Sequence, residues 1–447
     1  MTTKKVTIAT LGCKANQFES EALMASLEEK GYELTPFGQS ADITIINTCT
    51  VTHRADFQSR QMVRRALKAN PGALVIVTGC YAQADAEALA RIDGVSYLLG
   101  NSEKTRIPDL LPQMEKGELS AILVSDIQRE EVFPDLFPQT FHRHTRALLK
   151  IQDGCNARCS YCIVPHTRGR SRSLPPEKVI ERLDALGQRG FKEVVLTGIH
   201  IGSYGLDLSP RSSLSDLLRH VEESPSPPRV RLSSIEPLDF SRDLIDLLAT
   251  SRKICPHLHI PIQSGDDEVL ERMHRSYTRD FLHDLVHELH QRIAQVCIGA
   301  DIVVGFPGET EGAFRRTYAL IEALPVSYLH VFPFSSRKGT LASTLSQTVS
   351  EGSKKTRADQ MRRLGREKRQ AFYCRFLRQR LDVLVEDRRD KKTARWKGLS
   401  RNYIPVQIVD DGDLRDPSDW INRELPVLVT ELLDSVVLGR RGEREDG

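Results

Sequence analysis

The sequence predicts an α/β protein in three parts: an open parallel sheet, a partial (β/α) barrel and a small β-barrel. Apolar strand-like segments alternate with amphipathic helical segments through most of the chain, which is typical of parallel sheets. Near the end, the pattern changes to short strands of alternating hydrophobicity that are separated by charged turns. The chain has 447 residues, a length that allows about two to four domains and a sizeable core.

Each of the first three strand-like segments ends at a cysteine. These segments are residues 5–13, 41–49 and 73–80. Helical segments follow them, so residues 1–112 are predicted to form an open parallel sheet of flavodoxin-like type. Ligands of such sheets bind outside the carboxyl ends of the strands, where the cysteines would converge. Packing would explain any one of them, but the repeated position favours a three-cysteine cluster site. Its ligands would be Cys13, Cys49 and Cys80.

A denser cysteine motif follows the strand that opens the second part, within residues 153–172. Cys155, Cys159 and Cys162 form a C-x3-C-x2-C pattern, which can hold a soft metal or an iron–sulfur cluster. A structural zinc would need a fourth ligand, and no candidate lies nearby in the sequence. The bacterial ferredoxin spacing also differs. Three ligands on a four-iron cluster leave one iron free to bind and activate a small molecule.

The second part, residues 145–376, contains further strand-like segments separated by helical ones. They are residues 193–205, 229–237, 257–265, 298–310 and 327–335. This many βα units predicts a full or partial barrel whose active face lies at the carboxyl ends of the strands. Gly198 is expected to let the backbone approach a bound ligand, and Glu236 either contacts the cofactor or caps a turn. His257 and His259 are expected to be structural, because an alternating histidine pair is a weak metal signal.

Residues 113–144 are predicted to be a linker, and residues 377–441 to be the small β-barrel. Residues 354–401 carry 18 Lys and Arg against 6 Asp and Glu, a local net charge of +12 in a chain whose total is +3. This block suits an acidic polymer such as RNA, and a solvated helix face explains it equally well. Trp396 and Tyr403 would be platforms for stacked bases or part of the barrel core.

Cysteine usage and apolar patterning predict the compartment. Nine cysteines, in a chain too long to be a disulfide-stapled small domain, favour a reducing environment. No apolar run approaches the ~20 residues that span a bilayer, and the first residues contain no long apolar segment. The sequence therefore predicts a cytoplasmic protein with no membrane partner.

Several motifs together resemble one family. The C-x3-C-x2-C motif, with Tyr161 before its last cysteine, resembles the radical S-adenosylmethionine (radical SAM) signature. The stretches LGCKANQFES (11–20), INTCTVTHRADFQSR (46–60) and VTGCYAQ (77–83), with a C-terminal barrel similar to a TRAM domain, resemble the methylthiotransferases. Three subgroups act on isopentenyladenosine in tRNA, on threonylcarbamoyladenosine in tRNA, or on an aspartate of a ribosomal protein. The first two stretches and VFPFSSRKGT (331–340) are most similar to the threonylcarbamoyladenosine subgroup.

The resemblance implies a chemistry for both cysteine sets. Cys155, Cys159 and Cys162 would hold a 4Fe–4S cluster that binds and cleaves S-adenosylmethionine, with Gly198 and Glu236 near the cofactor. Cys13, Cys49 and Cys80 would hold a second, auxiliary 4Fe–4S cluster that carries the transferred sulfur. The substrate would be C2 of N6-threonylcarbamoyladenosine in the anticodon loop of tRNA, and an unidentified electron donor and sulfur source would be needed.

Two other hypotheses remain open at this point. A methylthiotransferase acting on isopentenyladenosine or on a ribosomal protein aspartate would carry the same cysteines. A protein of a different class, a non-catalytic iron–sulfur protein that binds RNA or senses redox state, would carry clusters without cleaving S-adenosylmethionine.

Overall fold

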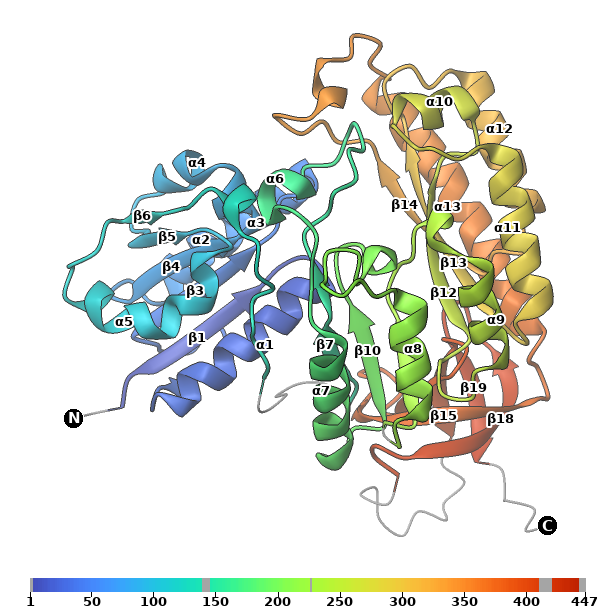
Figure 1. The fold of residues 1–447 in the computed structure, drawn as a ribbon, viewed down its shortest axis with the longest axis horizontal. Coiled ribbons are helices and arrows are strands. Elements are labelled where there is room, and N and C mark those ends of the chain that lie inside the picture. The colour runs from blue at the N-terminus through green and yellow to red at the C-terminus, as the bar shows by residue number, and fades with distance from the viewer. Residues whose placement is uncertain (1–2, 139–144, 226, 410–419, 442–447) are drawn as a thin grey trace.

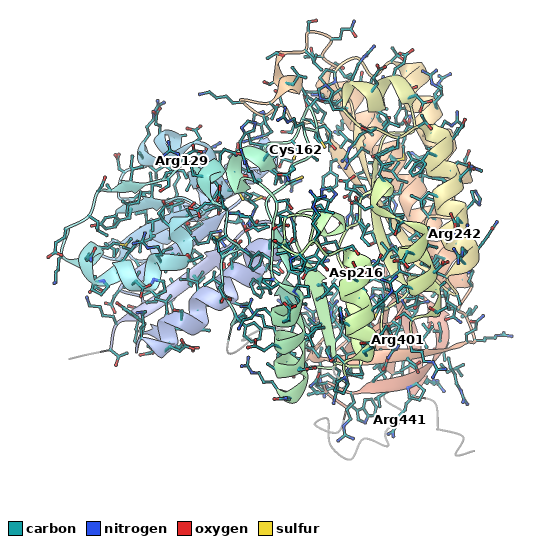
Figure 2. The ribbon with its side chains drawn as sticks, in the orientation of Figure 1. Arg129, Cys162, Asp216, Arg242, Arg401 and Arg441 are labelled. Carbon is teal, nitrogen blue, oxygen red and sulfur yellow. The ribbon has the colours of Figure 1, made fainter. Side chains whose placement is uncertain are left out.

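The computed structural model describes residues 3–138, 145–225, 227–409 and 420–441, which form three units (Figure 1). A parallel sheet with its helices contains the N-terminus, a partial barrel follows, and a small closed barrel lies beneath the strands of the partial barrel. All three predicted architectures are confirmed. Figure 2 shows Cys162 beside α6, between the first two units, whereas Arg401 lies on the closed barrel.

The N-terminal sheet contains six parallel strands in the order β2-β1-β3-β4-β5-β6, whose first five follow the flavodoxin-like order. The strands are β1 (Lys5–Thr10), β2 (Glu33–Leu34), β3 (Ile43–Thr48), β4 (Leu74–Gly79), β5 (Tyr97–Leu99) and β6 (Ile122–Leu123). Apolar side chains on both sheet faces form two core clusters with the helices. The helices are α1 (Lys14–Glu29), α2 (His53–Ala69), α3 (Cys80–Ala84), α4 (Ala86–Ala90), η1 (Glu103–Arg106) and α5 (Ile107–Glu115).

Two details of this unit differ from the expected pattern. The single helix expected after residue 80 is two short helices, because the Asp85 side chain accepts a hydrogen bond from Ala88 N at 3.1 Å and caps a new start. Strands β2, β5 and β6 were not expected, since two or three residues are too few to show alternation. Strand β6 comes from the stretch that the sequence suggests is a linker, of which residues 139–144 lie outside the described part.

The partial barrel consists of two three-stranded parallel sheets, β7-β10-β11 and β12-β13-β14. A parallel bridge between Val230 and Ile254 connects their neighbouring edges. The strands are β7 (Ala147–Lys150), β10 (Glu193–Thr197), β11 (Arg229–Leu232), β12 (His257–Gln263), β13 (Cys297–Val304) and β14 (Tyr328–Pro333). A further antiparallel pair, β8 (Gln152–Asp153) with β9 (Arg172–Ser173), lies between β7 and α7 in the chain and brackets the central cysteine motif.

Helices cover the outer face of this barrel and build the largest core cluster with its strands. They are α7 (Pro176–Gln188), α8 (Leu214–Glu223), α9 (Arg242–Thr250), α11 (Arg279–Arg292), α12 (Glu311–Ala323) and α13 (Glu351–Cys374). Shorter elements are η2 (Ile127–Arg129), α6 (Val164–Arg168), η3 (Ile201–Ser203), η4 (Pro237–Asp239), α10 (Asp267–Arg272) and η5 (Leu341–Thr344).

The C-terminal barrel closes in the order β15-β16-β17-β19-β18. Its strands are β15 (Arg380–Arg389), β16 (Trp396–Ser400), β17 (Pro405–Val409), β18 (Glu424–Leu432) and β19 (Val437–Arg441). The last two strands, β18 and β19, are joined by a turn in which Leu433 N donates to Val436 O at 2.9 Å. The long connection between Ile408 and Leu425 lies mostly outside the described residues. Trp396 is buried in the barrel core, and Tyr403 stacks on His257 with ring centroids 3.9 Å apart, so neither is an open platform for bases.

A buried carboxylate and its two arginine partners connect this small barrel to the partial barrel. Glu193 at the start of β10 lies 2.7 Å from both Arg229 and Arg231 on β11. Arg229 also pairs with Glu424 at 2.9 Å, and Arg231 donates to the Arg401 carbonyl at 2.9 Å. The small barrel therefore covers the amino ends of the strands and leaves the carboxyl ends open for the cysteines. In the described part of the chain, no helix is long and apolar enough to cross a membrane.

Candidate functional site

The structure brings Cys13, Cys49 and Cys80 to the carboxyl ends of β1, β3 and β4, which are adjacent strands. Cys13 immediately precedes α1, Cys49 follows β3 directly, and Cys80 begins α3. Gly12 has φ +98°, and a Cβ built on it would lie 2.9 Å from the Cys49 sulfur. Only glycine therefore allows the first two cysteine loops to approach this closely.

The surroundings of Cys49 oppose the ionisation of its thiol. Burial, together with the neighbouring thiols of Cys80 and Cys13, raises the pKa of Cys49 to about 12. Asn101 lies close, with its Nδ2 3.8 Å from the Cys80 sulfur. Thiolates crowded in this way are stable only when a bound cation compensates their charge. The donor set therefore fits iron, and an iron–sulfur cluster in particular.

The second set, Cys155, Cys159 and Cys162, lies on the loop between β8 and α6. Backbone hydrogen bonds from Cys155 N to Gly169 O (3.0 Å) and from Cys162 N to Cys159 O (3.1 Å) shape this loop. All three thiols are free and partly buried. Burial, with the neighbouring thiols Cys159 and Cys155, raises the pKa of Cys162 to about 12. This set fits a cluster for the same reason as the first.

His200 was not singled out in the sequence, yet it lies beside this second set. Its Nδ1 is 3.7 Å from the Cys155 sulfur, and its Nε2 is 2.7 Å from an Asp239 oxygen. Burial lowers the pKa of His200, but the hydrogen bonds to Asp239 and Cys155 outweigh burial and raise it to about 10. The imidazolium can thus donate to the sulfur. In the sequence, His200 is marked only by its place in the glycine-rich piece GIHIGSYG, two residues after Gly198.

The structure gives Gly198 a packing role that the sequence did not indicate. A Cβ on Gly198 would lie 2.9 Å from the carbonyl and side-chain oxygens of Gln152. The same side-chain oxygen accepts hydrogen bonds from the backbone N–H groups of Ile199 (2.9 Å) and His200 (2.8 Å). Gln152 thereby holds the His200 loop against the strand that leads into the cysteine motif.

Glu236 lies four residues after the end of β11, directly before the short helix η4. Its side chain makes no capping hydrogen bond to that helix. The carboxylate pairs instead with Arg275, which also donates to the Tyr161 hydroxyl at 2.8 Å. Burial raises the pKa of Glu236, against the opposing effect of Arg275. Because Tyr161 directly precedes Cys162, this chain of contacts connects Glu236 to the second cysteine set.

A buried network of charges links the two cysteine sets. Glu19 on α1 lies 2.7 Å from Lys150 and from Arg168, and 2.6 Å from Lys104. Asp153, two residues before Cys155, lies 2.9 Å from Lys150 and from Arg168. Burial would raise the pKa of Glu19, but the three cations hold it well below its usual value. Three cations against two carboxylates leave a positive charge, which favours anionic groups at both sets.

A second bridge reaches the N-terminal unit from the opposite edge of the barrel. Arg337, in the loop after β14, pairs with Asp56 on α2 at 2.7 Å and donates to the Thr50 hydroxyl at 2.7 Å. Thr50 directly follows Cys49. The N-terminal unit therefore contacts the barrel near β7 through the Glu19 network and after β14 through Arg337, so it spans the opening of the partial barrel.

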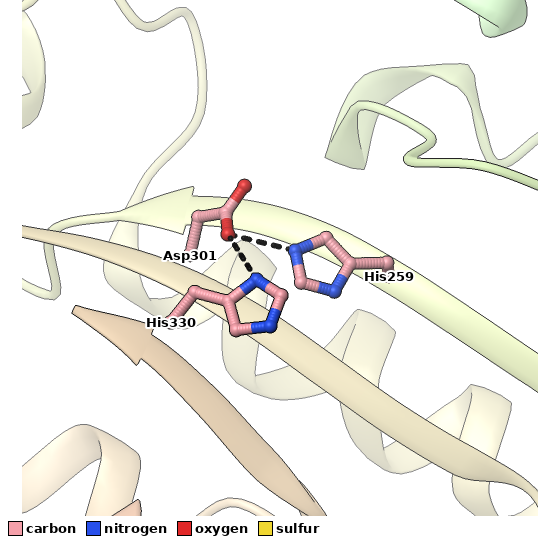
Figure 3. Close-up of side chains that lie close together, drawn as sticks. All are labelled: His259, Asp301 and His330. Carbon is pink, nitrogen blue, oxygen red and sulfur yellow. Dashed lines mark hydrogen bonds and ion pairs between the residues drawn. The ribbon is translucent and has the colours of Figure 1, made fainter. Parts of the chain in front are cut away.

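Inside the barrel, His259, Asp301 and His330 form a hydrogen-bonded group (Figure 3). One Asp301 oxygen lies 2.8 Å from His259 Nε2 and 3.3 Å from His330 Nδ1. The other ring nitrogen of His259 lies 3.0 Å from the Tyr328 hydroxyl. Burial would raise the pKa of Asp301, but the two histidines lower it to about 2. Both nitrogens of His259 have protein partners, in agreement with the structural role expected for this histidine.

A cavity of about 600 Å³ opens where the three units meet. The side chains that line it come from α1, from β7, β10 and β11, and from the C-terminal barrel. They include Lys14, Gln17, Arg146, Leu148, Val195, Arg231, Glu386, Arg388, Tyr403 and Asn422. Lys14 directly follows Cys13, so the cavity begins beside the first cysteine set.

Comparison with known proteins agrees with this arrangement. Residues 5–100 match the model described as "Uncharacterized protein family UPF0004", and residues 149–321 match the radical SAM superfamily. The threonylcarbamoyladenosine tRNA methylthiotransferase MtaB of Bacillus subtilis is 39% identical, covering 92% of this chain and 91% of the relative. The enzyme of the same name from Aquifex aeolicus is 36% identical, covering 90% and 96%.

Two more distant proteins are also similar to the chain. A tRNA-2-methylthio-N(6)-dimethylallyladenosine synthase from Pelotomaculum thermopropionicum is 32% identical, covering 96% of this chain and 95% of the relative. The solved structure of TsrM, a radical S-adenosylmethionine methyltransferase from Kitasatospora setae, shares the fold with a TM-score of 0.58 at 16% identity. It covers 76% of this chain and 77% of that chain.

The fold and the C-x3-C-x2-C loop define a radical SAM protein with an added N-terminal sheet unit. The chain belongs to the radical SAM methylthiotransferase family, in its MtaB subgroup. An iron–sulfur cluster and S-adenosylmethionine are the cofactors of this family, and the donor sets described above fit them.

Proposed function

We propose that the chain is a tRNA methylthiotransferase that adds a methylthio group to C2 of N6-threonylcarbamoyladenosine beside the anticodon. The observation that carries this proposal is the placement of two three-cysteine sets on facing units, joined by the buried Glu19 network. The names of the similar relatives given above support the reaction and the substrate.

We assign a cluster to each cysteine set. Cys155, Cys159 and Cys162 would hold a 4Fe–4S cluster with S-adenosylmethionine, and Cys13, Cys49 and Cys80 would hold a second 4Fe–4S cluster. When bound, these groups would supply the radical chemistry, the sulfur and the methyl group. The protein would keep the two sites at a constant separation through Glu19 and Arg337.

Three further residues would shape the cofactor site. His200 donates to the Cys155 sulfur and would stabilise negative charge on the cluster. The Glu236–Arg275 pair reaches Tyr161 beside Cys162 and would present polar atoms to S-adenosylmethionine. Gly198 would act indirectly, by allowing the His200 loop to pack against Gln152.

Each of the three units would have a separate role. We propose residues 1–112 as the auxiliary-cluster domain, 113–144 as a connection that adds an edge strand, and 145–376 as the radical SAM domain. Residues 377–441 would bind RNA, with basic side chains such as Arg388 at the cavity rim contacting phosphates of the anticodon loop.

The basic helix α13 is a weaker candidate for this contact. Several of its cations pair with its own acids or with backbone carbonyls, as Lys368 does with Leu324 O at 2.8 Å. A tRNA substrate and free cysteines suit the cytoplasm.

Mass spectrometry of tRNA nucleosides tests the proposed reaction. A strain without the gene should lack 2-methylthio-N6-threonylcarbamoyladenosine and accumulate the unmethylthiolated nucleoside. The wild-type gene should restore the modification, and the Cys155→Ala variant should not. Loss of 2-methylthio-isopentenyladenosine instead would assign the chain to the dimethylallyladenosine reaction. Unchanged tRNA would overturn both.

A further inference from the structure

The cationic side chains that line the cavity between the three units differ in whether they have a partner. Arg231 pairs with Glu193 at 2.7 Å, Arg146 with Glu386 at 3.3 Å, and Arg388 with Glu386 at 2.7 Å. Arg189 donates to the Pro138 carbonyl at 3.2 Å. Among the described residues, Lys14 has neither a side-chain hydrogen bond nor an ion pair, although it lines the same cavity.

The position of Lys14 is constrained by its surroundings. It is the first residue of α1, and Glu19, little more than one turn further along the helix, is anchored in the buried network. The first turn of α1 contains no acidic side chain, so the helix start adds its own positive potential. Apolar side chains of Leu148 and Val195 form part of the cavity wall. An unpaired ammonium in such a place favours an anion that arrives with a ligand.

We propose that Lys14 binds the carboxylate of the threonyl group on the substrate nucleoside. This inference rests on the proposed function and names the residue that would select the substrate. A threonylcarbamoyl group ends in a carboxylate, whereas a dimethylallyl group is a hydrocarbon. The carboxylate would pair with the ammonium, and a hydrocarbon would leave the ammonium without a partner in a partly apolar cavity.

Two RNA stem–loops test the proposal on the reconstituted enzyme. One contains threonylcarbamoyladenosine, and the other contains the same nucleoside with the threonine carboxylate changed to an uncharged carboxamide. The wild type should use the acid with a kcat/KM about 10- to 100-fold higher than the carboxamide. Lys14→Met should lose this preference mainly through slower use of the acid, and Lys14→Arg should keep most of it.

The matched control is Lys30→Met, the same change at the far end of α1, where Lys30 is exposed and pairs with Asp109. It should leave the preference as in the wild type. Iron content and 5′-deoxyadenosine formation show whether each variant retains its clusters. Equal use of acid and carboxamide by the wild type would overturn the proposal, whether or not Lys14→Met folds. An unchanged preference in a cluster-loaded Lys14→Met would also overturn it. Wild-type enzyme inactive on both RNAs would instead contradict the proposed function.

Discussion

The Glu19 carboxylate lies 2.7 Å from the Lys150 ammonium, and both side chains are buried at the boundary between the N-terminal sheet unit and the barrel. Glu19 belongs to the helix that begins next to Cys13, and Lys150 ends the strand that leads to Cys155. The pair therefore ties the first cysteine set to the second. If both sets act on one substrate, as proposed above, they need such a constant separation.

Removing the Glu19 charge should destabilise this boundary. In Glu19→Gln, Lys104 would lose its carboxylate partner, and Lys150 and Arg168 would share the carboxylate of Asp153. The free energy of unfolding should fall by roughly 3–5 kcal/mol, the usual cost of an uncompensated buried charge. Chemical denaturation of the iron-free chain at neutral pH measures this difference.

Glu29→Gln is the control, because Glu29 is exposed near the end of the same helix. It should change the unfolding free energy by less than about 0.5 kcal/mol. The folded pKa of Glu19 lies below its ordinary 4.5, so the carboxylate stabilises the fold above that pH and loses its effect as the pH falls. A Glu19→Gln variant as stable as Glu29→Gln would contradict the role of the network.

The contacts of Arg337 with Asp56 and Thr50 should limit local opening of the N-terminal unit. In Arg337→Met, Asp56 and Thr50 would lose their partner on the β14 side. Hydrogen exchange at residues 50–56 should accelerate by about tenfold or more, because this segment would open without global unfolding. The neighbouring Lys338→Met, at an exposed position, should leave the exchange unchanged. Equal exchange in the two variants would show that Arg337 does not hold the units together.

The fold class could be predicted from the sequence because the patterns that indicate it are local. Apolar segments such as 41–49 and 73–80 have strand length, and the cysteines at their ends mark one sheet edge. The contacts between units were not predicted, because Glu19 and Lys150 are 131 residues apart and show no pattern that relates them. His200 was missed for a similar reason, since its partner Asp239 comes from the next βα unit.

Glu193 should stabilise the junction with the C-terminal barrel in a pH-dependent way. Burial raises the pKa of Glu193, but Arg231, Arg229 and Arg146 outweigh burial and lower it to about 2. The carboxylate thus contributes roughly 3 kcal/mol above pH ~4.5, and this contribution is lost as the pH falls towards ~2. Denaturation of the wild type and of Glu193→Gln should show a difference that shrinks over this interval. Glu223→Gln, at an exposed position, should differ little from the wild type at any pH.

Iron and sulfide analysis of the anaerobically reconstituted chain tests the central claim, that two separate cysteine sets hold two clusters. The wild type should bind about eight iron atoms, as two four-iron clusters. Replacing Cys13, Cys49 and Cys80 with alanine should leave about four, and replacing Cys155, Cys159 and Cys162 should also leave about four. Replacing all six should leave none. A wild type with about four iron atoms, or a Cys13/Cys49/Cys80 variant with the same iron content as the wild type, would contradict the two-cluster account.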